Sequence, residues 1–236
     1  MWLPAAAGVV AAGGMGWAVR GRSASLLAPS VWKGPRSRRA IALTFDDGPS
    51  ESTPAVLELL AANHAKATFF MCGANVERLP AVARQVAEAG HEVANHSYSH
   101  SRLDFRPRQF MRIDLEDAQN AIASATGVTP KLFRAPYGVR WFGLGEVQKE
   151  LGLQGVMWSA IGLDWKLTGP EVSKRLAAAA ANGAIFCLHD GREKQASPDV
   201  SSTTGALATL LPELRERGFQ LVTVSELLGV PAPRTS

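Results

Sequence analysis

Cysteine is scarce in this sequence: the chain of 236 residues contains two, Cys72 and Cys187. Two cysteines cannot cross-link a fold of this length, and their spacing matches no zinc knuckle. An internal repeat is also lacking, which excludes a solenoid, and the 22 glycines and 14 prolines follow no period, which excludes a fibrous chain. Charged residues make up 19% and hydrophobic residues 46%, so the chain can bury the core of one large domain.

Acidic residues are missing from the first 45 positions, which contain six of the 25 basic residues. Subtracting these six leaves 19 basic against 21 acidic residues, so the rest of the chain carries a formal charge of about −2. The net charge of +4 and the pI near 9.3 therefore come from the N-terminal segment. Because the remainder is slightly acidic and shows no basic stripe interleaved with aromatic residues, we do not expect it to bind nucleic acid.

Residues 1–19 form an uncharged, apolar run. Its length just reaches the ~20 residues that span a bilayer, although alanine and glycine supply little transfer energy. No basic residue precedes the run, which disfavours a cleaved signal peptide. We interpret it as a candidate membrane anchor, followed by a basic linker over residues 20–39; the alternatives are an apolar tail packed on the domain and a lost upstream segment.

The predicted location is accordingly the membrane or the cell envelope. The basic residues after the apolar run favour a cytoplasmic domain by the positive-inside tendency, but we leave the orientation open.

Residues 40–228 alternate short apolar strands with amphipathic helices, and residues 229–236 form a tail. The apolar runs predict strands at 41–45, 67–72, 91–94, 132–133, 155–158, 184–188 and 221–224. Helices are predicted at 53–62, 80–89, 107–125, 141–151 and 170–181, and a last one ends at Gly218. In the helix at 107–125, the buried stripe is predicted to contain Phe110, Ile113, Ala118, Ala121 and Ile122. The alternation predicts a parallel α/β fold, either an open sheet or a barrel.

Polar clusters follow five of the predicted strands. These clusters are Asp46 with Asp47, His96 with His100, Arg134, Asp164 with Trp165, and His189 with Asp190. Each one alone has an ordinary structural explanation, such as an Asx turn before Gly-Pro or a solvated surface charge. In a parallel barrel, however, the residues just past the strand ends meet at one mouth. Five such clusters in one domain therefore predict an active site.

The residue types in these clusters suit metal-dependent hydrolysis. Two histidines and one carboxylate form an N₂O ligand set, which leaves coordination positions open, as a catalytic zinc site requires. Side chains of adjacent aspartates leave the backbone in different directions, so one can bind a cation while its neighbour takes a proton from water. We expect one divalent ion; zinc is the first choice, and cobalt, nickel and manganese suit the same ligands.

Five ordered motifs carry a resemblance to a known family. The segments TFDDGP (44–49), HSYSH (96–100), RAPY (134–137), Asp164-Trp165 and Leu188-His189 resemble the motifs of the polysaccharide deacetylases, the NodB-homology domain of carbohydrate esterase family 4. The resemblance covers about residues 40–228. It implies a distorted (β/α) barrel with about seven repeats and a hydrolase of carbohydrate metabolism.

The resemblance also implies roles for single residues. Asp46 resembles the general base and Arg134 the residue that orients it, while His189 resembles the general acid, with Asp164 fixing its tautomer and raising its pKa. The residues that resemble the metal ligands are Asp47, His96 and His100.

Three further residues are implied to contact the substrate. Tyr137 would offer its main-chain N–H to the oxyanion, and Trp165 and Leu188 would wall a small apolar pocket for the acetyl methyl. One position departs from the family, because Ile161 stands where an aspartate is common, three residues before Asp164. This departure leaves the local loop geometry open.

The leading hypothesis is a hydrolase that removes the N-acetyl group from a sugar, N-acetylglucosamine in a glycan or glycolipid, and releases acetate and a free amine. A second hypothesis keeps the same metal site and changes the substrate to a non-sugar amide. A third is a catalytically silent glycan-binding module. That module predicts a broken base, acid or ligand set, and all these positions are filled here.

Overall fold

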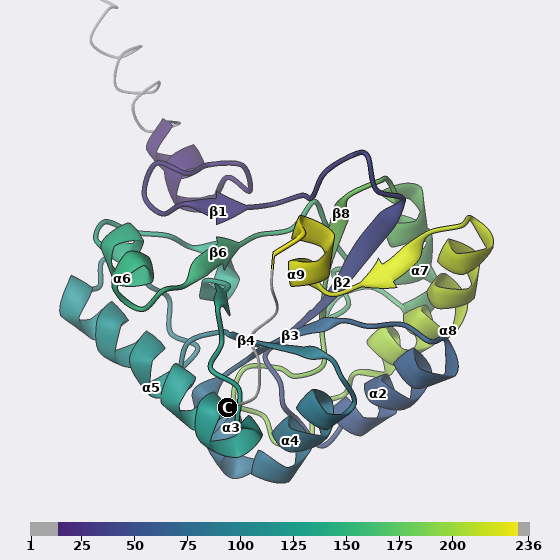
Figure 1. Ribbon diagram of the computed structural model, residues 1–236, viewed down its shortest axis with the longest axis horizontal. Helices are drawn as coiled ribbons and strands as arrows, with labels where there is room; N and C mark the ends of the chain where they lie inside the picture. Colours follow the sequence, from purple (N-terminus) through teal and green to yellow (C-terminus); the bar gives the residue numbers. More distant parts are fainter. Residues whose placement is uncertain (1–13, 231–236) are drawn as a thin grey trace, which may run out of the picture.

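The computed structural model describes residues 14–230 and has a curled sheet of parallel strands surrounded by helices (Figure 1). The strands are β1 (Ser30–Val31), β2 (Ala40–Asp46), β3 (Thr68–Met71), β4 (Glu92–Asn95), β5 (Leu132–Phe133), β6 (Gln154–Val156), β7 (Ala160–Ile161), β8 (Ala184–His189) and β9 (Gln220–Val222). Their order is β1-β6-β5-β4-β3-β2-β8-β7, and β9 pairs with β2. The predicted α/β barrel of the NodB type is confirmed.

Helices follow most strands and cover the outside of the sheet, as Figure 1 shows. They are α2 (Thr53–Ala62), α3 (Gly73–Arg78), α4 (Pro80–Glu88), α5 (Arg108–Thr126), α6 (Leu144–Glu150), α7 (Gly169–Ala178), α8 (Ser201–Glu216) and α9 (Val224–Leu228), with a short 3₁₀ turn η1 (Pro136–Gly138). Residues 14–20 are also helical. The short elements β1, β7, α3 and α9 were not predicted, because two to six residues carry too little periodicity to be recognised.

Strand β2 pairs with β3, β8 and β9 and is buried along its whole length. Its side chains alternate between two faces, as in any strand. Ile41, Leu43 and Phe45 pack with α2, α7 and α8 in the main outer core. Ala40 and Ala42 face the inside of the barrel, where Val224 and Leu227 of α9 share their cluster. The inner face of β2 thus leads along the lumen to Thr44 and Asp46.

The stretch interpreted as a linker, residues 20–39, lies on the domain. Its strand β1 pairs with β6, and Ala24 and Ala28 are each 1% exposed. Arg140, itself buried, donates hydrogen bonds to the carbonyl oxygens of Gly21 and Ala24. Since burying a guanidinium requires such partners, this contact ties the segment to the barrel.

Most of the candidate membrane anchor at residues 1–19 lies outside the described residues, so that prediction is untested. Within residues 14–230, no helix combines the length and the apolar character needed to cross a bilayer.

The buried stripe of α5 differs from the predicted one at Ile113, which is 43% exposed. The buried residues instead include Met111, Leu115, Ala118 and Ile122, which follow the i, i+4, i+7, i+11 spacing of one helix face. A single exposed isoleucine is ordinary on a protein surface, and hydrophobicity alone placed it wrongly.

Candidate active site

The carboxyl ends of four strands bring the predicted polar residues together. Asp46 is the last residue of β2 and His189 the last of β8, and the two are register partners in this parallel pair. His96 directly follows β4, and Arg134 directly follows β5. Because all the strands are parallel, these residues meet at one end of the barrel.

Asp47, His96 and His100 converge on one point. The Oδ1 atom of Asp47 lies 3.0 Å from Nε2 of His100 and 3.4 Å from Nε2 of His96. One ligand atom of each residue lies within 4.8 Å of the others, and all three side chains are buried. Although burial alone would raise it, hydrogen bonds to His100 and His96 hold the pKa of Asp47 well below its usual range.

The protonation state of His96 indicates what this triad suits. Its Nδ1 lies 2.8 Å from the carbonyl oxygen of Arg134, and because a carbonyl only accepts, Nδ1 carries the proton. In the neutral imidazole the lone pair of Nε2 then faces the carboxylate of Asp47, which is also an acceptor, and Nε2 donates to Asp47 only when the ring carries a second proton. Two buried acceptors facing each other repel unless a proton or a metal ion lies between them, so the N₂O set fits a divalent ion that takes the place of the proton.

The loop that carries both histidines is held by local hydrogen bonds. Ser97 and His100 have φ values of 65° and 53°, in the left-handed region that side chains rarely adopt. The Oδ1 of Asn95 accepts from the Ser97 N–H at 2.8 Å, and the Ser97 hydroxyl accepts from the His100 N–H at 3.0 Å. These bonds stabilise a backbone that would otherwise cost about 1–3 kcal/mol per strained residue.

Asp46 is held by one buried guanidinium. Nη1 of Arg134, which is fully buried, donates to Oδ1 of Asp46 at 2.7 Å and to the hydroxyl of Thr44 at 2.6 Å. The other Arg134 nitrogens donate to the carbonyl oxygens of Val156 and Met157. Because all three nitrogens of its guanidinium are hydrogen-bonded, Arg134 has a fixed orientation. It therefore orients the Asp46 carboxylate, whose Oδ2 faces the metal triad.

His189 is held by Asp164. Oδ1 of Asp164 lies 2.8 Å from Nδ1 of His189, and Oδ2 accepts from the His189 main-chain N–H at 2.8 Å and from the Thr203 hydroxyl at 2.7 Å. Burial favours the neutral imidazole, but the carboxylates of Asp164, Asp47 and Asp46 outweigh it and raise the pKa of His189 to about 9. The imidazolium is thus kept at neutral pH, although Ile161 replaces the usual aspartate nearby.

Tyr137 and Trp165 lie at the rim of the site. Their side chains are about half exposed, at 49% and 47%. The Tyr137 ring lies edge-on to His100, with centroids 4.8 Å apart, and Trp165 lies edge-on to His189 at 5.0 Å. Tyr137 adopts a φ of 57°, so the main chain turns sharply beside the metal triad.

Leu188 does not reach the site. It is fully buried in the outer core cluster, and a Cβ added at Gly162 would lie 2.7 Å from its Cδ2 and 3.2 Å from Val172 of α7. The prediction that it walls the acetyl pocket is therefore incorrect for this chain. Because strand residues alternate, Cys187 shares the inner face with His189, and its Sγ lies 3.5 Å from Oδ2 of Asp46.

Sequence reasoning missed other residues that shape the site. The main-chain N–H of Glu193 donates to Oδ2 of Asp47 at 3.0 Å, and its carboxylate accepts from the Tyr137 hydroxyl at 2.7 Å. Asn75 donates to the carbonyl oxygens of both Asp47 and Glu193. Glu193 lies in the irregular loop after β8, where no periodic signal could have identified it.

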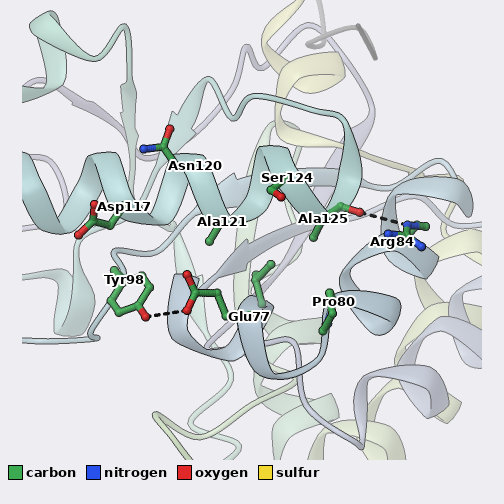
Figure 2. Close-up of a pocket in the computed structure, with 10 residues that line it drawn as sticks. Glu77, Pro80, Arg84, Tyr98, Asp117, Asn120, Ala121, Ser124 and Ala125 are labelled. Atoms are coloured by element: carbon green, nitrogen blue, oxygen red, sulfur yellow. Dashed lines mark hydrogen bonds between the residues drawn. The ribbon is translucent and has the colours of Figure 1, made fainter.

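A separate hollow of roughly 600 Å³ lies among α3, α4 and α5, away from these residues (Figure 2). Its lining includes Glu77, Arg84 and Asp117, and the Tyr98 hydroxyl donates to Glu77 at 2.9 Å. Tyr98 connects it to the histidine loop, but none of the metal-triad residues line it. The chemistry is therefore concentrated at the strand ends and not in this hollow.

Comparison with known proteins identifies the family. A family model described as polysaccharide deacetylase matches residues 33–156. A peptidoglycan-N-acetylglucosamine deacetylase of Bacillus cereus is 39% identical over 202 residues, which cover 84% of this chain and 92% of the relative. The chain belongs to the polysaccharide deacetylase family. Its five motifs thus predicted the family correctly.

Other family members differ in length and in the substrate that their names give. The peptidoglycan-N-acetylglucosamine deacetylase PgdA of Listeria monocytogenes is 37% identical over 207 residues, which cover 87% of this chain. The chain spans 42% of the length of that relative. A chitooligosaccharide deacetylase of Bradyrhizobium is 36% identical over 198 residues, which cover 80% of this chain and 90% of the relative.

Solved structures of the family share the fold. The Bc1960 peptidoglycan N-acetylglucosamine deacetylase has a TM-score of 0.81 at 28% identity, and the match covers 87% of this chain and 95% of that protein's chain. A second structure is a mutant of a Bacillus anthracis pseudoenzyme of the family in which enzymatic activity is restored. It has a TM-score of 0.78 at 29% identity, and the match covers 86% of this chain and 72% of the mutant's chain. The same fold therefore occurs with and without activity, and the side chains of the site must decide between them.

Proposed function

We propose that this chain is a metal-dependent carbohydrate deacetylase that hydrolyses the N-acetyl group of N-acetylglucosamine in a cell-envelope glycan. The observation that carries the proposal is the position of Asp46 and His189, which lie together beside the triad of Asp47, His96 and His100 at one end of the barrel. The names of the bacterial relatives support the substrate class, since they act on peptidoglycan N-acetylglucosamine and on chitooligosaccharides.

Asp47, His96 and His100 are the residues that would hold the ion, and zinc is the metal we propose first. A divalent ion supplies Lewis-acid polarisation of a carbonyl and lowers the pKa of water at such a site. The buried carboxylate and the fixed tautomer of His96 provide the charge and the lone pair that this requires.

Each reacting proton has an acceptor or a donor in the site. Asp46 takes the proton of the attacking water on Oδ2, while Arg134 holds Oδ1. The water oxygen bonds to the acetyl carbonyl carbon, and the main-chain N–H of Tyr137 donates to the oxyanion that forms. When the carbon–nitrogen bond breaks, His189 gives the proton on Nε2 to the leaving amine, and Asp164 stabilises the imidazolium before that transfer. Acetate and the free amino sugar are the products.

The rim suits a sugar chain better than a small amide. Tyr137 and Trp165 present half-exposed aromatic surfaces beside His100 and His189, and such surfaces pack against sugar rings. We assign catalysis to residues 40–228, with residues 20–39 packed on this domain and residues 229–236 as a tail. The proposed place of action is the cell envelope, and the role of residues 1–19 as an anchor stays a prediction.

Acetate release from a panel of N-acetylated glycans and small amides tests the proposal, with chelator and metal add-back. We expect release from N-acetylglucosamine oligomers that stops with chelator and returns with zinc. Release from small amides alone would favour the second hypothesis. Glycan binding at full metal occupancy without release would favour a silent module, and the family does include a pseudoenzyme.

Two variants separate the base from the ligands. Asp46→Asn should keep the metal and lose at least about 100-fold in turnover, because general-base catalysis contributes roughly 10²–10⁴-fold. His96→Ala should lose both metal and turnover. Asp117→Asn, a carboxylate change on the exposed side of α5, is the matched control. Wild-type turnover in Asp46→Asn would show that the base is assigned wrongly.

A further inference from the structure

A second group of potential ligands lies beside the metal triad. Asp46, Cys187 and His189 each place one ligand atom within 4.8 Å of the others. Asp46 and His189 are register partners on β2 and β8, and Cys187 lies two residues before His189 on the same inner face. The three residues therefore offer oxygen, sulfur and nitrogen to one small volume.

The free atom of each residue is fixed by what holds the other atom. Arg134 occupies Oδ1 of Asp46, so Oδ2 is directed to the thiol of Cys187, 3.5 Å away. Asp164 occupies Nδ1 of His189, which leaves Nε2 for the site. Cys187 is 1% exposed and cannot turn to solvent.

We propose that Asp46, Cys187 and His189 form a second divalent-cation site, specific for thiophilic ions such as cadmium and, in excess, zinc. A cysteine sulfur selects soft ions over magnesium or calcium, and an acid, a thiolate and an imidazole are all zinc ligands. The ion displaces two protons, that of the Cys187 thiol and that on Nε2 of His189, which both leave to solvent, and it gains bonds to sulfur and to nitrogen.

This site is weaker than the triad of Asp47, His96 and His100. Arg134 competes for the charge of Asp46, the thiol and the His189 imidazolium must each lose a proton, and an ion in the triad repels a second cation. Occupation therefore follows that of the triad. Because the second ion takes both Asp46 and His189, it inhibits the enzyme; this consequence rests on the proposed function, whereas the binding itself does not.

A cobalt titration of the full-length metal-free protein tests the binding. The first equivalent should give cobalt d–d absorption without a thiolate band, and a further equivalent should add the sulfur-to-cobalt charge-transfer band in the near ultraviolet. Cys187→Ser and Cys187→Ala should keep the first change and lose the second. Cys72→Ser is the matched control, since Cys72 is equally buried but belongs to neither ligand group of the described residues.

Two results would overturn the second site: no thiolate band at any cobalt excess, or a band of equal strength in both Cys187 variants. Circular dichroism shows whether each variant is folded. If one of the two Cys187 variants does not fold, the other still tests the second site.

Acetate release then measures the consequence for activity. Excess zinc or cadmium should inhibit the wild type and Cys72→Ser, while Cys187→Ser should need roughly tenfold more metal for half inhibition, because one of three ligands is lost. Equal inhibition of both proteins would refute the inhibitory role. If no acetate is released at one equivalent of zinc, the proposed function is contradicted. The number of cobalt ions bound in the titration still tests the second site by itself.

Discussion

Replacing Asp164 with asparagine should shift the range of pH in which the enzyme works. Asp164 is the largest of the contributions that raise the pKa of His189 from 6.5 to about 9, a shift worth on the order of 3 kcal/mol. Asparagine keeps the shape and can still accept from the His189 main chain and the Thr203 hydroxyl. With that charge gone, burial opposes only the smaller contributions of Asp47 and Asp46, and the pKa of His189 should fall toward its ordinary value of 6.5.

The expected deficit depends on pH. Near pH 8, about 90% of His189 is protonated in the wild type but roughly 3% in Asp164→Asn, so the acid form falls about 30-fold. Near pH 6 the protonated fraction of His189 differs less than about twofold between the two proteins. Any loss of imidazole orientation adds a factor that is the same at every pH.

The sign for stability follows from the same shift. The pKa of His189 is raised on folding, so its protonation stabilises the folded protein. This contribution to the free energy of unfolding is fully present below pH 6.5 and is lost as the pH rises through about 9. The free energy of unfolding of chelated wild-type protein should therefore decline over this window by up to about 3 kcal/mol, and that of Asp164→Asn should not.

The assay is acetate release with one equivalent of zinc, expressed as the ratio of wild type to variant across pH 6 to about 9, since ionisations shared by both proteins cancel in the ratio. Thr203→Val is the control, because it removes a hydrogen bond to Asp164 and leaves the charge. A ratio that stays constant with pH in Asp164→Asn would refute the reasoning, since only geometry would then have changed.

Other substitutions test the support of the site. Arg134→Lys should lower turnover by about 100-fold without releasing the metal, because lysine cannot reproduce the fork that holds Asp46; retained turnover would argue against a positioning role. Gly48→Ala should destabilise the protein by about 1–3 kcal/mol, since its Cβ would lie 2.3 Å from Oδ2 of the buried Asp190. Gly205→Ala in α8, whose added Cβ would lie 3.8 Å from its nearest neighbour, the Cα of Gly169 in α7, should instead stabilise the protein by about 0.5–1 kcal/mol. Urea unfolding measures both, and equal effects of the two alanines would contradict the steric argument.

Much of the site could be predicted because its residues are grouped in short segments. Asp46 and Asp47 are adjacent, His96 and His100 are four apart, and each segment follows an apolar run that any reading identifies as a strand. In a parallel barrel this is enough to bring them together, because the strand ends share one mouth.

The error at Leu188 arose because both faces of β8 are apolar. In a strand buried on two sides, hydrophobicity does not distinguish the face that packs on helices from the face that lines the lumen. The packing of α7 against Leu188 decides this, and it leaves Cys187 beside Asp46.

The sequence by itself determined the parallel α/β architecture, the family and the set of acids and histidines, since these depend on local patterns and on residue identity. Only the tertiary structure decided which nitrogen of His96 is protonated, that the Glu193 main chain reaches Asp47, and that Cys187 faces Asp46. These features depend on contacts between residues 38, 146 and 141 positions apart, and the orientation of a side chain over such separations is fixed by packing rather than by its neighbours in the chain.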